Sequence, residues 1–292
     1  MTTHTHPPAG WYPDPHDPNS QRWFDGHGWT SHVVFRQAQA EGGGAGASRS
    51  SVVAPPRGSW GLPDIGWMTL FIVGALVAGV VIVVVGALIN PEVFDGAGLD
   101  YNVPAVAWIL VISQGVAMAG LAAWPLIVGR WKGDGWRAAF GFVVDGRAWW
   151  VGAVGGIATF IVLLVLTLIS SLILGEEVDS AAAEVVSGMS EVTLAYAIFL
   201  VFIAIGAPFV EEISFRGLLW GAIVKRGWSP WIATAISGVA FGLFHFEPQR
   251  VVALIAAGFV LGVVRHYAGL AASMLAHCIV NSIGVFFLLL GT

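Results

Sequence analysis

The sequence predicts an all-α fold: a polytopic membrane helix bundle of about seven transmembrane helices, preceded by a small soluble module. Two observations carry this prediction. Of the 292 residues, 57% are hydrophobic and only 11% are charged, whereas soluble domains carry about 25% charged residues. The mean hydropathy is +0.79. The composition therefore excludes an ordinary soluble enzyme, and the single cysteine, Cys278, excludes an intrachain disulfide.

Residues 1–36 are expected to form a Trp-rich cytosolic module. Its aromatic residues can build a tiny core, and Asp25-Gly26 is a turn signal between short strands. The aromatic residues are Trp11, Tyr12, Trp23, Phe24 and Trp29. Their spacing resembles a short bacterial domain of unknown function that precedes membrane segments. We expect protein contact through residues 9–34. A metal site from His16, His27 and His32 is disfavoured because no ligand spacing recurs.

Residues 37–60 contain runs of Gly, Ser and Pro and predict a flexible linker. The apolar segments that follow are each about long enough to cross hydrocarbon at 1.5 Å per residue. The expected spans are 67–89, 104–128, 150–174, 193–213, 230–246, 250–266 and 270–290. Residues 61–149 would hold the first helices and a basic cytosolic loop. Residues 214–224 are expected to extend the fourth helix along the inner surface as an amphipathic segment.

The charges of the loops predict the orientation. Loops 90–103 and 175–192 contain acidic residues and no Lys or Arg, whereas the loop 129–149 is basic. The basic residues assigned to the inner side are Arg130, Lys132, Arg137, Arg147, Lys225, Arg226 and Arg265, and only Arg250 falls outside. Because positive charge stays in the cytosol, we expect a multi-pass protein of the cell membrane with the N-terminus cytosolic and the C-terminus external.

Two adjacent glutamates, Glu211 and Glu212, interrupt the apolar sequence of the fourth segment. A charged side chain inside a bilayer costs a few kcal/mol or more and usually marks function. Adjacent residues point about 100° apart on a helix, so the two carboxylates cannot do the same work. Arg216, at i+4 from Glu212, suits an intrahelical ion pair, which leaves Glu211 to face a cavity. The alternative is an ion cluster that only locks helices together.

Three polar residues follow on later apolar segments: His245, with Phe241 at i−4, and then His277 with Asn281 at i+4. The pair on the last helix shares one face and predicts a polar cavity. Counting along the helices places His245 about 20 Å and His277 about 9 Å from the inner face. Either the cavity is tall, or the fifth helix begins below the membrane surface near Trp228.

This set of side chains suits hydrolysis. A carboxylate in a cavity of low dielectric constant is a competent general base for water. An imidazole can orient that water or protonate a leaving amine, and the Asn281 amide can stabilise an oxyanion. Ser214 and Cys278 are not placed as nucleophiles, so water is the expected attacking group.

The motifs E-E-x-x-x-R, F-x-x-x-H and H-x-x-x-N, in this order over about residues 150–290, resemble the CAAX protease and bacteriocin-processing (Abi) family of intramembrane proteases, which includes the type II CAAX prenyl endopeptidase. The resemblance implies that residues 150–292 are an intramembrane protease domain, a helix bundle around a cavity open to the cytosol. It implies endopeptidase activity, which in eukaryotic members removes the last three residues after prenylation. By motif, Glu211 would activate water with His245, and His277 and Asn281 would bind the oxyanion. Glu212 and Arg216 would support them.

The expected partners are a membrane-associated peptide or protein substrate and the lipid bilayer, and no nucleic acid. The family is often labelled metalloprotease, but the chain lacks H-E-x-x-H. We therefore favour activation of water without metal, with a divalent ion such as zinc as the alternative cofactor. Two other functions stay open. One is a non-catalytic immunity or scaffold protein of the same family. The other is a transporter that uses the same polar residues, although no internal repeat is visible.

Overall fold

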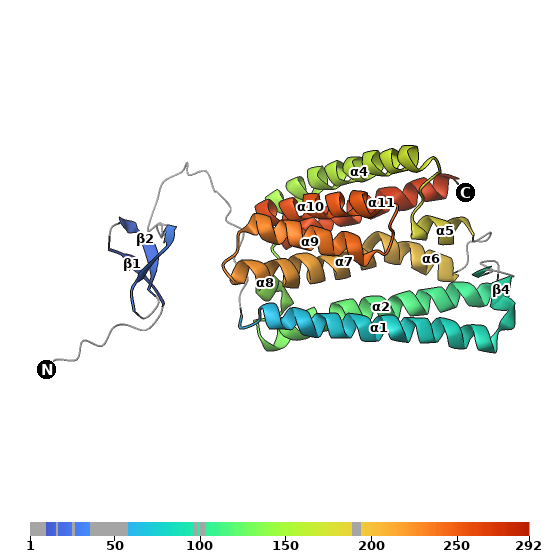
Figure 1. Ribbon diagram of the computed structural model, residues 1–292, viewed down its shortest axis with the longest axis horizontal. Coiled ribbons are helices and arrows are strands. Elements are labelled where there is room, and N and C mark those ends of the chain that lie inside the picture. Colours follow the sequence, from blue (N-terminus) through green and yellow to red (C-terminus); the bar gives the residue numbers. More distant parts are fainter. Residues whose placement is uncertain are drawn as a thin grey trace. The chain divides into compact units, whose positions relative to one another are not determined.

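The computed structural model describes residues 10–15, 17–24, 27–35, 58–95, 98–99, 103–188 and 194–291. The chain divides into two compact units, Met1–Ser50 and Ser51–Thr292, which are considered separately (Figure 1). Three features predicted from the sequence lie outside the described residues: the turn Asp25-Gly26, His16, and residues 37–57 of the linker.

The first unit is a three-stranded antiparallel sheet in the order β1 (Gly10–Asp14), β2 (Asp17–Phe24), β3 (Trp29–Phe35). Phe24 is buried beneath Tyr12 and Trp29, with ring centroids 6.4 and 5.3 Å away in edge-to-face contacts. An ion pair of 3.0 Å between Arg22 and Asp14 ties β2 to β1. The prediction of short aromatic strands around a tiny core is confirmed for these residues.

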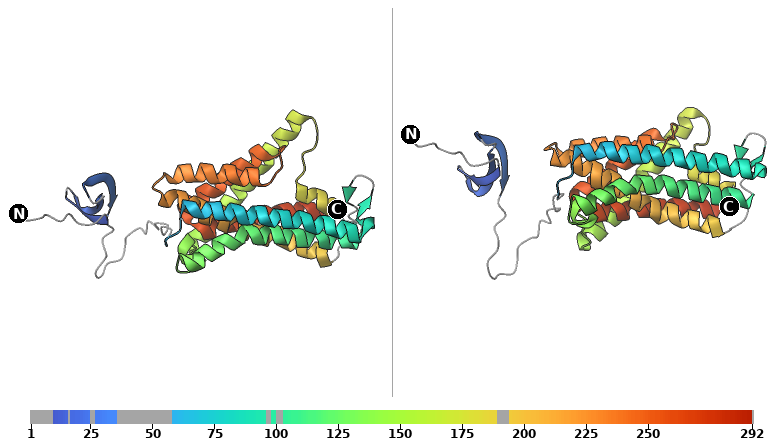
Figure 2. Two further views of the ribbon diagram at one scale, coloured as in Figure 1. Left: turned by 60° about the horizontal axis from the view of Figure 1, so that its bottom comes forward. Right: turned by 90° about the horizontal axis from the view of Figure 1, so that it is seen from below.

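The second unit is a bundle of helices. The helices before the two glutamates are α1 (Leu62–Ile89), α2 (Pro104–Trp131), the short α3 (Trp136–Phe140), α4 (Gly146–Leu174) and α5 (Ala181–Ser187). The single turn η1 (Pro91–Val93) and the two-residue strands β4 (Phe94–Asp95) and β5 (Gly98–Leu99) join α1 to α2. In Figure 2, α1 and α2 lie side by side in both views, and α4 packs against α10 and α11.

The rest of the bundle begins with a composite helix. It runs through α6 (Leu194–Val201), the π-helical turn η2 (Phe202–Gly206), α7 (Ala207–Glu212), a second π-helical turn η3 (Ile213–Leu219) and α8 (Trp220–Lys225). The hairpin of α9 (Pro230–Phe244) and α10 (Val251–Ala268) follows, and α11 (Leu270–Gly291) ends the chain.

Six of these helices are long and apolar enough to cross a membrane, and the protein is a multi-pass membrane protein. The prediction of an all-helical membrane bundle with a small N-terminal module is confirmed. The fifth of the seven predicted spans, 230–246, corresponds to α9, which has only 15 residues and is not among these six. The turn between α9 and α10 stops short of the end of the bundle at which α1 meets β4 (Figure 1).

One predicted feature of the fourth span is wrong. Residues 214–224 do not lie on the surface as an amphipathic segment, because η3 and most of α8 are buried. Their apolar side chains pack on α2 and α9, and Trp220 Nε1 donates a hydrogen bond of 3.1 Å to Thr234. The span Leu194–Lys225 is therefore one helix of 32 residues.

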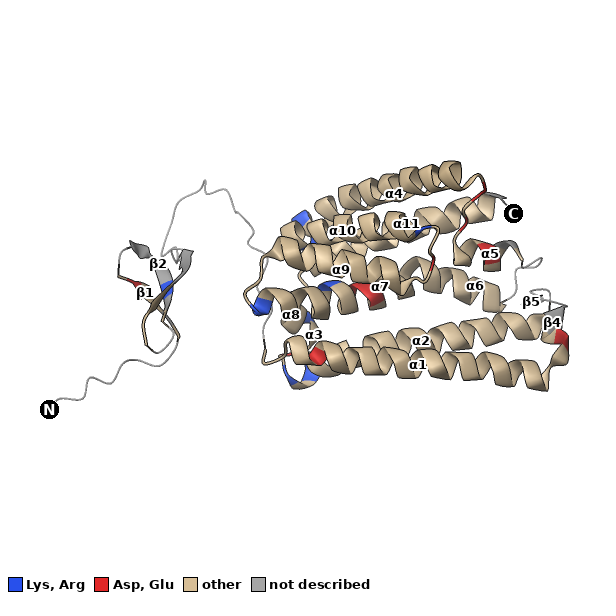
Figure 3. Ribbon diagram, viewed as in Figure 1, with Lys and Arg blue, Asp and Glu red and all other residues tan. Residues whose placement is uncertain are grey.

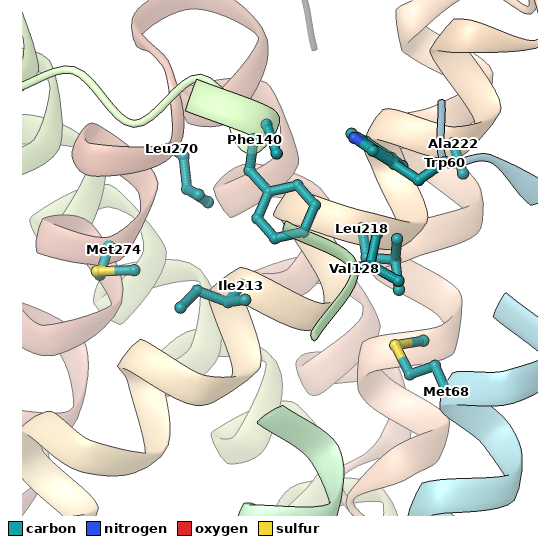
Figure 4. Close-up of a cluster of buried hydrophobic side chains, with 10 residues drawn as sticks. Trp60, Met68, Val128, Phe140, Ile213, Leu218, Ala222, Leu270 and Met274 are labelled. Carbon is teal, nitrogen blue, oxygen red and sulfur yellow. The ribbon is translucent and has the colours of Figure 1, made fainter. Parts of the chain in front are cut away.

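The end of the expected linker belongs to the core of the bundle. Trp60 is 2% exposed and meets Phe140 edge-to-face at 5.2 Å. Figure 4 shows both rings in a cluster with Ile213, Leu218 and other buried apolar side chains. Ser59 N donates to Lys132 O at 2.8 Å, and Lys225 Nζ lies 4.1 Å from the centroid of the Trp60 ring.

The charges are sorted along the bundle. Most Lys and Arg residues lie at the end that carries α3 and α8, where Asp64 pairs with Lys132 at 2.6 Å, and the acidic residues around α5 and β4 lie at the opposite end (Figure 3). Arg265 is an exception to the sequence prediction. It was expected in an inner loop, but it lies within α10 and its side chain is fully buried.

Candidate active site

The two adjacent glutamates end α7, between the π-helical turns η2 and η3. A π-helical turn accommodates one more residue than an α-helical turn and is often found at functional sites. Glu211 and Glu212 are both buried, and their environments differ.

Glu212 is completely buried and surrounded by donors. Arg216 Nη1 donates to Oε1 at 2.8 Å, which confirms the predicted ion pair. Ser273 Oγ donates to Oε2 at 2.5 Å. His277 Nδ1 lies 3.0 Å from Oε1. Because a paired carboxylate only accepts hydrogen bonds, Nδ1 of His277 carries a proton in this contact.

Glu211 has no such partners. Its side chain is buried, and Oε2 accepts no hydrogen bond from any described residue. Nε2 of His277 lies 3.8 Å from Oε2 of Glu211. Glu211 is only 5% exposed, and that it faces a cavity stays a prediction. A buried acceptor without a hydrogen bond costs about 1–3 kcal/mol and requires an explanation.

Phe241 is a common contact of His245, His277 and Arg216. The His245 ring lies 4.6 Å from the Phe241 ring, and His245 Nδ1 lies 2.8 Å from the Phe241 carbonyl. His277 packs against the same ring at 5.4 Å, and the guanidinium of Arg216 lies over it at 4.5 Å. One residue from each of the three predicted motifs, Arg216 in η3, His245 after α9 and His277 in α11, therefore contacts one aromatic ring.

Asn281 lies one turn beyond His277 on α11, and its Nδ2 donates to the Ile203 carbonyl in η2 at 2.9 Å. A side-chain amide has two N–H groups. The described contact uses one of them, and the second is available for another acceptor.

Two parts of the chain match models of known protein families. Residues 193–283 match a family model described as Type II CAAX prenyl endopeptidase Rce1-like. The chain carries a domain of this family. The matched range contains Glu211, Glu212, Arg216, His245, His277 and Asn281, and it is narrower than the range of about 150–290 expected from the motifs. Residues 9–42 match a second family model, described as Protein of unknown function (DUF2510). No curated protein and no solved structure matches the chain.

Within the Rce1-like domain, three groups of the site were not predicted. Ser273 lies at i−4 from His277, and this spacing on one helix face could have indicated it. The Gly258 carbonyl accepts from Arg216 Nη2 at 2.8 Å, where α9 and α10 cross closely. Nothing in the sequence pattern indicates a main-chain acceptor. Arg265 was not predicted as a site residue, because it lies near the end of an apolar segment and was counted with the basic residues of the inner side.

Two other reactive side chains, Ser214 and Cys278, have no hydrogen bond to either carboxylate among the described residues. The Ser214 hydroxyl lies within hydrogen-bond distance of the Leu121 and Val210 carbonyls, at 2.9 and 3.0 Å. Cys278 is free and half-buried. Among the described residues, no group of three or more His, Cys, Asp or Glu side chains is arranged to hold a metal ion. Glu212 is already engaged by Arg216, Ser273 and His277, so we assign no metal ligand here.

Proposed function

We propose that the chain is an intramembrane endopeptidase that hydrolyses peptide bonds of membrane-associated proteins or peptides, with Glu211 as the general base for water. One observation carries the proposal. Glu211 Oε2 is a buried carboxylate oxygen without a hydrogen bond from the described residues, and it faces His277. Such a group is costly for stability and is suited to accept a proton from a bound water.

The proposed reaction has two steps. Water attacks the peptide carbonyl carbon while Glu211 takes a proton from it, with His245 orienting the water. The oxyanion that forms accepts hydrogen bonds from His277 Nε2 and the second N–H of Asn281. The C–N bond then breaks, and Glu211 returns the proton to the leaving amine.

This scheme needs His277 to be protonated on both nitrogens, with Nδ1 directed to Glu212 and Nε2 to the oxyanion. The two carboxylates, 3.0 and 3.8 Å from these nitrogens, compensate the charge of such a ring. Glu212 and Arg216 support the reaction by fixing His277 and do not contact the substrate.

The placement in the cell is part of the same proposal. The basic residues around α3 and α8 support an orientation with the N-terminus in the cytosol and the C-terminus outside. We propose that residues 9–34 contact a protein and take no part in the chemistry.

The test uses purified protein and a labelled peptide tethered to the membrane, with and without a chelator. Cleavage that depends on Glu211 supports the proposal. If folded wild-type protein cleaves no tethered peptide, a non-catalytic scaffold or immunity role would replace the proposed peptidase function. Proton-coupled uptake of a solute that requires Glu211 would instead indicate a transporter.

A further inference from the structure

A second buried cation, Arg265 of α10, lies next to the candidate site. Its side chain is completely buried, and its guanidinium lies 4.8 Å from the Trp220 ring. Nε donates to the Arg216 carbonyl at 3.1 Å and Nη2 to the Phe140 carbonyl at 2.9 Å. No carboxylate among the described residues forms an ion pair with it. Buried arginines are normally paired with acids, so a cation held by main-chain carbonyls needs a reason.

The contacts of α10 with Arg216 give that reason. Arg216 donates from its guanidinium to the Gly258 carbonyl at 2.8 Å, and its own carbonyl accepts from Arg265. Gly258 and Arg265 are seven residues apart, which is about two helical turns and places them on one face. This face of α10 therefore holds Arg216 at both its side chain and its main chain.

The π-helical turns explain why a main-chain contact matters. In an α-helix each carbonyl accepts from the N–H four residues later, and in a π-helical turn from the N–H five residues later. Where the pairing shifts, a carbonyl can lose its main-chain partner. The Ile203 carbonyl in η2 accepts from Asn281, and the Arg216 carbonyl in η3 accepts from Arg265. The helix segment with the two glutamates is thus held at both ends by side chains of other helices.

We propose that Arg265 is a positioning residue of the site: it fixes η3, and through Arg216 and Glu212 it fixes the ring of His277. Only one part of the proposal, the expected effect of Arg265 on kcat, rests on the proposed peptidase function. Its structural part is independent, because it concerns the contact between Glu212 and His277. Lysine keeps the charge but cannot reproduce two hydrogen bonds from a planar fork.

The experiment compares the full-length chain with Arg265→Lys and Arg265→Met, in nanodiscs. Arg250→Lys is the matched control, because Arg250 immediately precedes α10 and pairs only with Glu247 among the described residues. Two quantities are measured: kcat and KM for the tethered peptide, and the ¹⁵N spectrum of the His277 imidazole, assigned with His277→Asn.

We expect Arg265→Lys to fold, to lower kcat on the order of 10²-fold with KM unchanged, and to alter the His277 Nδ1 signal. Arg250→Lys should change neither quantity. If Arg265→Met does not fold, the comparison of Arg265→Lys with the wild-type protein tests the proposal. A folded Arg265→Lys protein with wild-type kcat and an unchanged His277 spectrum would overturn the proposal, even if its folded yield is lower than that of the wild type. If wild-type protein cleaves nothing but Arg265→Lys still alters the His277 signal, the peptidase function fails and the positioning role stands.

Discussion

Glu212 fixes the ring of His277 through a contact of 3.0 Å between Oε1 and Nδ1, and this contact leaves Nε2 directed toward Glu211. The two adjacent carboxylates therefore have separate roles around one imidazole. Glu212 has a full set of donors, and Glu211 Oε2 has none from the described residues. This asymmetry is the basis of the predictions below.

Replacing Glu211 with Gln keeps the shape of the side chain and removes the base. Cleavage of the tethered peptide should fall by on the order of 10²-fold or more, the range for loss of a general base. Glu177→Gln is the control, because Glu177 is exposed and lies in the loop after α4. Wild-type cleavage by folded Glu211→Gln protein would exclude the mechanism.

Asn281→Ala removes an amide donor from the site. We expect kcat to fall on the order of 10²-fold with little change in substrate binding, because an oxyanion exists only after attack. Ser282→Ala, an exposed neighbour on the same helix, should behave as wild type. A rise in KM at constant kcat would show instead that Asn281 binds the ground state.

Arg216→Ala should lower the yield of folded protein, because it leaves Glu212 buried without its ion partner. Breaking a buried pair in this way costs about 3–5 kcal/mol. The double variant Arg216→Met with Glu212→Gln removes both charges and should recover part of the loss in thermal unfolding. If the double variant is no more stable than Arg216→Ala, the ion pair is not the source of the effect.

The orientation can be tested by thiol labelling in intact cells, starting from Cys278→Ala because Cys278 is the single native cysteine. A cysteine at Asp179 should react with an impermeant reagent, and one at Ser48 should react only after lysis. The opposite pattern would reverse the proposed orientation and move the basic end of the bundle to the outside.

Removal of residues 1–57 should leave cleavage in detergent largely intact, since residues 1–50 form the other unit and residues 51–57 belong to the expected linker. Trp60→Ala should instead destabilise the bundle by about 3–5 kcal/mol, as for other buried aromatic residues, because Trp60 packs on Phe140. Thermal unfolding and peptide cleavage measure both changes. A folded bundle without residues 1–57 that cannot cleave would assign the module a part in the reaction.

The sequence predicted what depends on spacing within one helix. The pair of Glu212 and Arg216 follows from their i+4 separation, and the shared face of His277 and Asn281 follows in the same way. Contacts between helices could not be predicted so directly. Counting residues placed His245 and His277 at different depths, yet both rings reach Phe241. Phe241 lies in α9, one turn before His245, which brings it nearer to the depth counted for His277.

Arg265 was misassigned for a related reason. A basic residue near the end of an apolar segment is normally counted as part of the adjoining loop. Its burial depends on η3, whose carbonyl it contacts, and π-helical turns have no clear signal in a single sequence. Gly258 could not be predicted from the sequence either, because it contributes only its main-chain carbonyl to the contact with Arg216.

The short helix α9 has a consequence for the lipid around it. Its 15 residues extend about 22 Å, less than the roughly 30 Å thickness of a hydrocarbon core. The turn after α9 carries Glu247 and Arg250, which pair at 2.5 Å. At membrane depth, the non-helical main chain of such a turn must be surrounded by protein or by water. We expect the bilayer beside this hairpin to thin or to admit water, so that lipids with shorter acyl chains favour the protein. Reconstitution in bilayers of graded thickness would reveal this preference as a rise in thermal stability in the thinner membranes, and stability independent of thickness would exclude it.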